Sequence, residues 1–262
     1  MIVDIWFRWC TNFLGLIVLL GFFSGCGNGG SSAPPPPPIP VQGIYYGQYT
    51  VTGAASPVDV YGAIDSGGFA YFADEYGTLY VLPTITDTGT LGGTMTAYAS
   101  AGQTFSNGQS VTTFQVNASI SSDGVFVSGE FSQTGETGTF QLNYEPLTIS
   151  NVTASAGVYQ GFYWGNGGNT AITLTLSPNN TFSGTDGFGC QISGAITPIP
   201  GYNLFTVTAD STGQAVCAGN VSGLGFAGTD DLTGQFGGVP GVYFYVGAAN
   251  AKAGFTAEFK AQ

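Results

Sequence analysis

Very few side chains in this sequence have the chemistry that enzymes use. The 262 residues include no histidine, three Lys or Arg and 15 Asp or Glu, which gives a net charge of −12. Without histidine, the Ser-His and Cys-His nucleophile systems and all histidine metal sites are excluded. Carboxylates and cysteines are the reactive groups that remain.

Three sets of carboxylates have a spacing worth testing. Asp87-Thr88-Gly89 is the triplet of aspartic proteases, in which two aspartates share a proton, but it occurs once and a turn is the competing interpretation. Asp74-Glu75 and Asp230-Asp231 offer oxygen ligands to calcium, without the spacing of a calcium loop. Glu130 with Glu136 is an acid and base pair for a glycosidase. We expect solvated turn carboxylates, hence no enzyme, metal or cofactor; a carboxylate-only hydrolase is the alternative.

Cys26 stands at the end of an export signal. An apolar run over residues 13–23 is followed by Ser24, Gly25 and Cys26. This order predicts a lipoprotein whose signal peptide, residues 1–25, is removed and whose Cys26 carries the lipid. An uncleaved membrane anchor is the alternative, but the run has about eleven residues, fewer than the roughly 20 that cross a bilayer.

Cys190 and Cys217 remain as a pair once Cys10 leaves with the signal. An exported protein meets oxidising conditions, which predicts a disulfide between them. The closed loop of under thirty residues would stabilise the second half by roughly 3 to 4 kcal/mol. A redox dithiol, the alternative, usually has a closer spacing.

Residues 26–42 are rich in Gly, Ser and Pro, with a proline run from Pro34 to Pro38. Such a segment favours extended polyproline II geometry and acts as a tether. Beyond it the bases are Lys252 and Lys260 alone. Nucleic acid and anionic membrane surfaces need clustered bases, so we expect neither as a partner.

The rest of the chain contains two similar halves. The segment at residues 43–49 recurs at residues 157–163, and residues 74–79 recur at residues 186–191 with nearly the same offset, so that Thr78 corresponds to Cys190. Two motifs with one offset predict a duplicated unit. We place the first unit at residues 43–148 and the second at residues 155–262.

Both halves have the period of β-strands. Residues 170–176, 242–246 and 255–260 alternate apolar and polar side chains, as half-buried strands do. Turn signals at residues 177–180, 122–124 and 200–203 separate short strands, and no sustained helical stripe occurs. We predict an all-β protein with two antiparallel units, each a barrel of roughly eight strands. Glycines at residues 92–93 and 223–225 suit the bends of closure. A sandwich in each unit and one merged barrel are the alternatives.

Two segments carry a resemblance to a known group. Residues 189–198, Gly-Cys-Gln-Ile-Ser-Gly-Ala-Ile-Thr-Pro, and residues 136–144, Glu-Thr-Gly-Thr-Phe-Gln-Leu-Asn-Tyr, resemble a family of two-repeat Gram-negative outer-membrane lipoproteins with a lipobox and a low-complexity spacer. The resemblance implies outer-membrane localisation, a disulfide in the second unit and a two-unit architecture. Gly27 and Asn28 after the cysteine agree with sorting to that membrane. The family implies no activity.

These observations together predict a lipid-anchored lipoprotein of the cell envelope, on the periplasmic face or the cell surface of the outer membrane. Tyrosine, threonine and asparagine are abundant and charge is scarce, which suits hydrogen bonding and stacking. We therefore expect a non-catalytic binding module for a protein or a glycan. A structural envelope component without a discrete ligand is the alternative.

Overall fold

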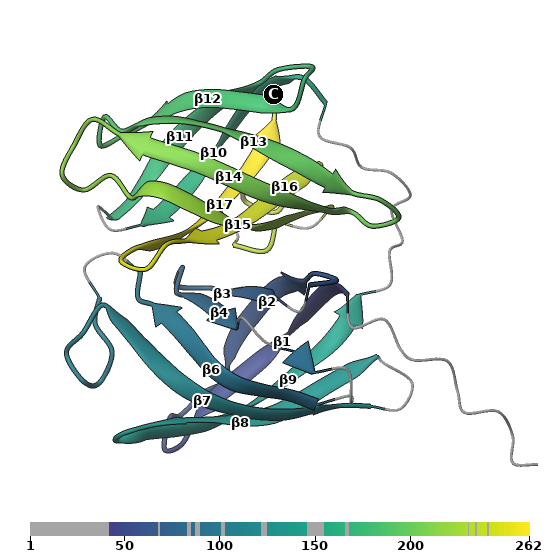
Figure 1. The fold of residues 1–262 in the computed structure, drawn as a ribbon, viewed down its shortest axis with the longest axis vertical. Helices are drawn as coiled ribbons and strands as arrows, with labels where there is room; N and C mark the ends of the chain where they lie inside the picture. Colours follow the sequence, from purple (N-terminus) through teal and green to yellow (C-terminus); the bar gives the residue numbers. More distant parts are fainter. Residues whose placement is uncertain are drawn as a thin grey trace, which may run out of the picture. The chain divides into compact units, whose positions relative to one another are not determined.

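The computed structural model describes residues 42–262, apart from residues 68, 83–84, 87–89, 101–102, 122–124, 146–154, 166–167, 230, 234 and 240. Within this part the chain forms 17 β-strands (Figure 1). None of these residues belongs to a helix able to span a membrane. The export signal, residues 26–41 of the tether including Cys26, the Asp87 triplet and Asp230 lie outside the described residues.

The first half of the chain is an antiparallel barrel, called here the first barrel. Its strands are β1 (Gly43–Val51), β2 (Val58–Ile64), β3 (Ala70–Asp74), β4 (Leu79–Leu82), β5 (Ile85–Thr86), β6 (Thr90–Tyr98), β7 (Val111–Ile120), β8 (Phe126–Gln133) and β9 (Glu136–Glu145). They follow the order β4-β3-β2-β1-β9-β8-β7-β6-β5, and pairing of β4 with β6 closes a ring of eight strands. The two-residue strand β5 extends the sheet beyond β6.

The second half is a closed barrel of eight strands, the second barrel, drawn in green to yellow in Figure 1. Its strands are β10 (Gly157–Gly165), β11 (Gly168–Leu176), β12 (Thr181–Asp186), β13 (Gln191–Ile199), β14 (Leu204–Thr212), β15 (Gly219–Gly228), β16 (Tyr243–Ala249) and β17 (Gly254–Ala261). Consecutive strands pair along the chain, and β10 pairs with β17. The prediction of two barrels is confirmed, and the merged barrel is wrong because the strands form two separate sheets.

The alternation of side chains predicted the direction of many residues correctly. Ile172 and Leu176 are buried in the core of the second barrel, whereas Thr173 and Thr175 on the same strand are exposed. The predicted turn at residues 177–180 joins β11 to β12, with Asn180 in the left-handed region at φ 65°. The turn at residues 200–203 joins β13 to β14.

Strands β16 and β17 differ from the prediction of half-buried strands. On β16, Tyr243 and Tyr245 are 0% and 2% exposed, and on β17 Thr256 and Glu258 are 2% and 0% exposed. The outer face of these strands is therefore covered as well as the inner face. Its cover includes a third hydrophobic cluster within the compact unit of residues 38–262, in which Tyr61 of β2 packs edge-on against Tyr245 at 5.5 Å between ring centroids.

In each barrel the first strand pairs with the last, and this pairing includes a glycine at which a Cβ would collide with the opposite backbone. A Cβ added at Gly47 on β1 would lie 1.9 Å from the carbonyl oxygen of Gln141 on β9. A Cβ added at Gly161 on β10 would lie 2.1 Å from the carbonyl oxygen of Glu258 on β17. These glycines hold corresponding places in the repeated segments at residues 43–49 and 157–163, so both halves close in the same way.

We expect Gly161→Ala to lower the free energy of unfolding by about 1–3 kcal/mol, as other overpacked sites do. The added methyl group would collide with backbone, which cannot rotate aside as a side chain does. Gly157→Ala on the same strand is the matched control, because a Cβ there meets nothing within 4 Å. Urea unfolding of the two full-length variants measures the difference, and equal losses of stability would contradict this account of closure.

Candidate functional site

The first barrel encloses a cavity of about 630 Å³. Its wall is largely apolar, with the residues Val60, Phe72, Leu82, Leu91, Phe114, Val116, Phe131 and Leu142. Small-molecule sites in proteins are mostly apolar clefts of about 300–1,000 Å³ with a few polar groups. The cavity therefore has the size and lining of a ligand site.

The second barrel has a filled interior instead. Its cavity measures about 70 Å³. Aromatic rings occupy the space, with Tyr163 against Phe255 at 5.0 Å and Tyr159 against Phe244 at 5.3 Å between centroids. The two barrels have the same number of strands but differ in whether side chains fill the interior. Both arrangements occur among barrels of eight strands.

The cavity of the first barrel has polar groups at one end. The β3–β4 turn, the β6–β7 loop and the β8–β9 turn lie at the same end because neighbouring strands alternate in direction. These segments contribute Tyr76, Gln103 and Ser106, which are exposed, and half-buried Glu136 to the cavity lining. This end is therefore the mouth of the cavity, where it meets solvent.

Asp74 is the most deeply buried polar group at this mouth, with 1% of its surface exposed. Its Oδ1 accepts hydrogen bonds from the backbone N–H groups of Tyr76 (3.0 Å) and Thr78 (2.8 Å). Its Oδ2 accepts from the hydroxyls of Tyr49 (3.0 Å) and Tyr80 (3.1 Å). Four donors thus compensate for the removal of this carboxylate from water. We call Tyr49, Asp74 and Tyr80 the mouth cluster.

Burial raises the pKa of Asp74 above its usual value, while its hydrogen bonds with Thr78, Tyr49 and Tyr80 act in the opposite direction. Burial likewise raises the pKa of the hydroxyls of Tyr49 and Tyr80, and the negative charge of Asp74 adds to the shift. The two phenols therefore stay protonated at neutral pH.

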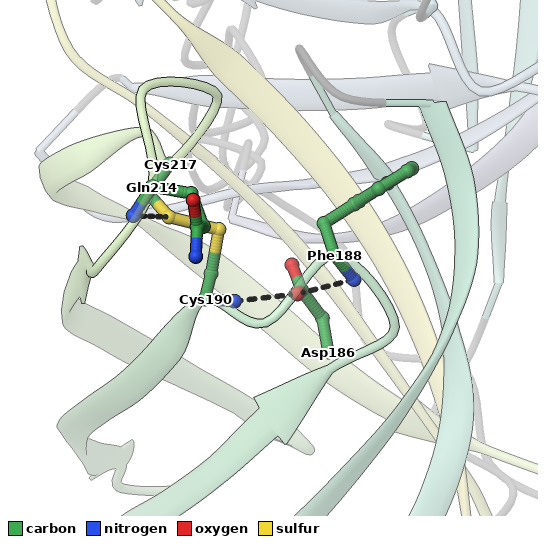
Figure 2. The surroundings of a disulfide bond; sticks show 5 residues. All are labelled: Asp186, Phe188, Cys190, Gln214 and Cys217. Carbon is green, nitrogen blue, oxygen red and sulfur yellow. Dashed lines mark hydrogen bonds between the residues drawn. A yellow bond between two sulfur atoms is a disulfide. The ribbon is translucent and has the colours of Figure 1, made fainter.

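The second barrel repeats the turn without the mouth cluster. Asp186 Oδ1 accepts from the N–H groups of Phe188 and Cys190, both at 2.9 Å (Figure 2). Gly77 and Gly189, the fourth residues of the two turns, have the same φ of 83°. Two residues beyond Cys190, Ile192 occupies the place that Tyr80 has in the first unit. Asp186 Oδ2 has no hydrogen-bond partner among the described residues.

A disulfide joins this second turn to the loop after β14. Cys190 and Cys217 are bonded with their Cα atoms 5.7 Å apart, and the bond closes a loop with a sequence separation of 27. The backbone N–H of Gln214 donates to the sulfur of Cys217 at 3.1 Å (Figure 2). The disulfide expected from the sequence is present, and it lies where the first unit carries Thr78.

The other carboxylates considered in the sequence do not converge on one site. Glu130 is exposed on the outer face of β8, whereas Glu136 lines the cavity, so the barrel wall separates this pair. The oxygens of Asp74 are occupied by N–H and O–H donors, which contradicts the expectation of a solvated turn carboxylate. Asp231 Oδ2 accepts from the N–H groups of Phe236 and Gly238.

Sequence reasoning missed two of the three residues of the mouth cluster. Tyr49 had a usable signal, because Tyr45, Gly47 and Tyr49 alternate along β1 and Tyr45 is a core residue. Tyr80 lies in a strand of four residues, too short for a periodicity to be recognised. Within the described residues, no group of three or more Cys, Asp or Glu is placed to hold a metal ion.

Glu258 is a further buried carboxylate, and it is not part of the cavity lining. Glu258 on β17 accepts hydrogen bonds from the hydroxyl of Tyr245 at 2.7 Å and from the hydroxyl of Thr233. Burial raises its pKa to about 7, although both hydrogen bonds act in the opposite direction. Because Thr233 belongs to the loop between β15 and β16, the carboxyl fastens this loop to the barrel.

The fold and the site together define a class of protein: two antiparallel β-barrels in tandem, the first with a ligand-sized cavity. Comparison with protein-family models, with curated proteins and with solved structures found no match to the chain.

We expect the stability of the protein to fall as the pH rises from about 5 to about 8. The folded state keeps Glu258 protonated up to a pKa of about 7, whereas the unfolded state ionises near the usual pKa of 4.5. The contribution of Glu258 is thus complete below pH 4.5 and is lost as the pH rises through 7. Asp74, whose pKa is also raised, contributes with the same sign.

Thermal unfolding as a function of pH measures this effect. Glu258→Gln should make the melting temperature less dependent on pH over this range. Glu130→Gln, on the exposed outer face of β8, is the matched control and should keep the wild-type slope. A slope that Glu258→Gln leaves unchanged would show that Glu258 titrates normally.

Proposed function

We propose that this protein is a non-catalytic binding module of the cell envelope that takes a small, largely apolar molecule into its first barrel. The cavity of about 630 Å³ carries the proposal, since the second barrel retains about 70 Å³. Packed interiors rarely hold voids larger than a water molecule. A space of this size, with an apolar wall and a solvent-facing mouth, favours a ligand.

The distribution of aromatic side chains favours a small molecule over a protein or a glycan. Of the 14 tyrosines, all in the described part of the chain, Tyr76 at 62% is the exposed one. A surface of stacking tyrosines, which the composition favours, is therefore not the main feature of the described part. Aromatic rings line the cavity instead, including Tyr49, Phe114 and Phe131.

The second barrel supports a structural role for its own half. Its core is filled, and its disulfide closes a loop that stabilises the fold by roughly 3 to 4 kcal/mol in the chain-entropy model. We infer that this half is a rigid support for the binding half. The alternative of a structural role without a discrete ligand is thus proposed for the second unit.

Placement at the outer membrane is part of the same proposal and depends on the lipid on Cys26. The tether of residues 26–42 would then hold the barrels near the lipid surface. A hydrophobic ligand exchanged with a membrane needs a carrier at that surface, and lipid anchoring provides one.

Metabolic labelling with palmitate in a Gram-negative host tests the anchor. The full-length chain should incorporate label, and Cys26→Ala should abolish incorporation. Cys10→Ala is the matched control and should remain labelled, because Cys10 leaves with the signal peptide. Label retained in the Cys26→Ala protein would refute the anchor.

A hydrocarbon fluorophore tests the cavity. Diphenylhexatriene is dark in water and emits in apolar surroundings, so its fluorescence should rise on binding to the full chain carrying Cys26→Ala, which lacks the lipid. Val116→Trp would place an indole in the cavity and should weaken binding at least about tenfold, or about 1.4 kcal/mol. Gln115→Trp makes the same change on the exposed face of β7 and should bind as the parent does. Equal binding by the two variants would place the dye outside the cavity.

A further inference from the structure

The three side chains of the mouth cluster use all of their hydrogen-bond donors in hydrogen bonds with one another. Tyr49 and Tyr80 hydroxyls lie 3.0 and 3.1 Å from Asp74 Oδ2, and 3.1 Å from each other. With Asp74 ionised, both hydroxyl protons point to the carboxylate. With Asp74 protonated, three protons serve the three contacts of a closed ring. In both states no proton is left to donate to a ligand, whereas the hydroxyl oxygens keep lone pairs that accept.

The charges around the cavity have the same preference. Its lining contains two carboxylates, Asp74 and Glu136, and no Lys or Arg. Glu136 Oε2 already accepts from Ser106 and Gln133, so its contribution is also that of an acceptor. Both lysines of the described residues, Lys252 and Lys260, belong to the second half. An anionic head would meet two carboxyl groups and no cationic side chain in the cavity lining.

We propose that the ligand of the first barrel is an amphiphile with a hydrogen-bond-donating head, an amine or an alcohol, and not a carboxylate. Its apolar tail fills the cavity, and its head donates to the mouth cluster beneath Tyr76. This inference rests on the proposed function and specifies the ligand that the cavity selects. The selection comes from the buried acceptors. Gln103 and Thr104 at the rim are exposed, so water can hydrogen-bond to them as well as a ligand can.

Three ligands with the same ten-carbon chain test the head group. Decylamine, decanol and decanoate compete with diphenylhexatriene for the full chain carrying Cys26→Ala, each below the concentration at which it forms micelles. Hydrogen bonds to charged groups exceed neutral ones and unpaired buried groups are costly, so decylamine should bind at least about tenfold more tightly than decanoate. Decanol should also bind more tightly than decanoate. Any binding to the apolar segment at residues 13–23 is common to all variants.

Asp74→Asn replaces a hydrogen-bond acceptor of the mouth cluster with a donor. The asparagine oxygen can still accept from the N–H groups of Tyr76 and Thr78, while its NH₂ group replaces Oδ2 and donates to the two hydroxyls. At least one phenol proton then becomes free to donate to a ligand. The preference for decylamine over decanoate should fall at least about tenfold. Asp186→Asn is the matched control in the second barrel, with the same turn and no tyrosine pair, and should keep the wild-type preference.

The outcomes separate the two proposals. If diphenylhexatriene and all three decyl compounds fail to bind, the proposed function and this inference both fall. If the dye binds and decanoate competes as well as decylamine, the inference falls and the proposed function stands. The wild-type series decides this even if Asp74→Asn does not fold. If Asp74→Asn and Asp186→Asn change the preference equally, the mouth cluster is not the selective element.

Discussion

Both halves of this protein depend on the pairing of the first strand of a barrel with its last strand. Strand β1 pairs with β9, and β10 pairs with β17, across about a hundred residues of chain. Gly47 and Gly161 stand at these seams because a Cβ would meet a carbonyl oxygen of the opposite strand. Closure removes the free edges of the sheet and separates an interior from water. The cavity of the first barrel, with Asp74 at its mouth, and the filled core of the second barrel exist because of this separation.

The turn that is repeated in the two barrels shows how the same strand arrangement can surround an open cavity or a packed core. Asp74 and Asp186 hold the same loop by the same pair of N–H contacts. In the first unit Tyr80 brings a hydroxyl to the free side of the carboxylate, whereas Ile192 in the second unit brings an apolar side chain. The first barrel thus has an open cavity with polar groups at its mouth. The second barrel has a packed core, and a disulfide joins its turn to the loop after β14. Both copies of the turn hold their loop in place, and the proposed binding role belongs to the first copy.

The buried acids oppose stability, and their contacts limit the cost. Burial raises the pKa of both Asp74 and Glu258, so ionisation of either group is penalised in the folded state. Glu258 fastens the loop before β16 through Thr233, while Asp74 holds the β3–β4 turn and two tyrosines. Networks of this kind fix a single arrangement of the groups they join. At the mouth this leaves acceptor oxygens in a constant position.

The sequence by itself determined the strand period, the duplication, the turns and the disulfide partners, because each is recorded in the types and spacing of nearby residues. It did not determine the cavity, because an empty volume depends on how side chains from eight strands meet. It placed Glu258 among the polar residues of a half-buried strand, since alternation cannot register a second covering layer. Asp74 and Tyr49 are 25 residues apart, and the pairing of β1, β2 and β3 in one sheet brings their oxygens to 3.0 Å. Features that depend on nearby residues could therefore be predicted from the sequence, whereas contacts between residues far apart in the sequence were decided by the tertiary structure.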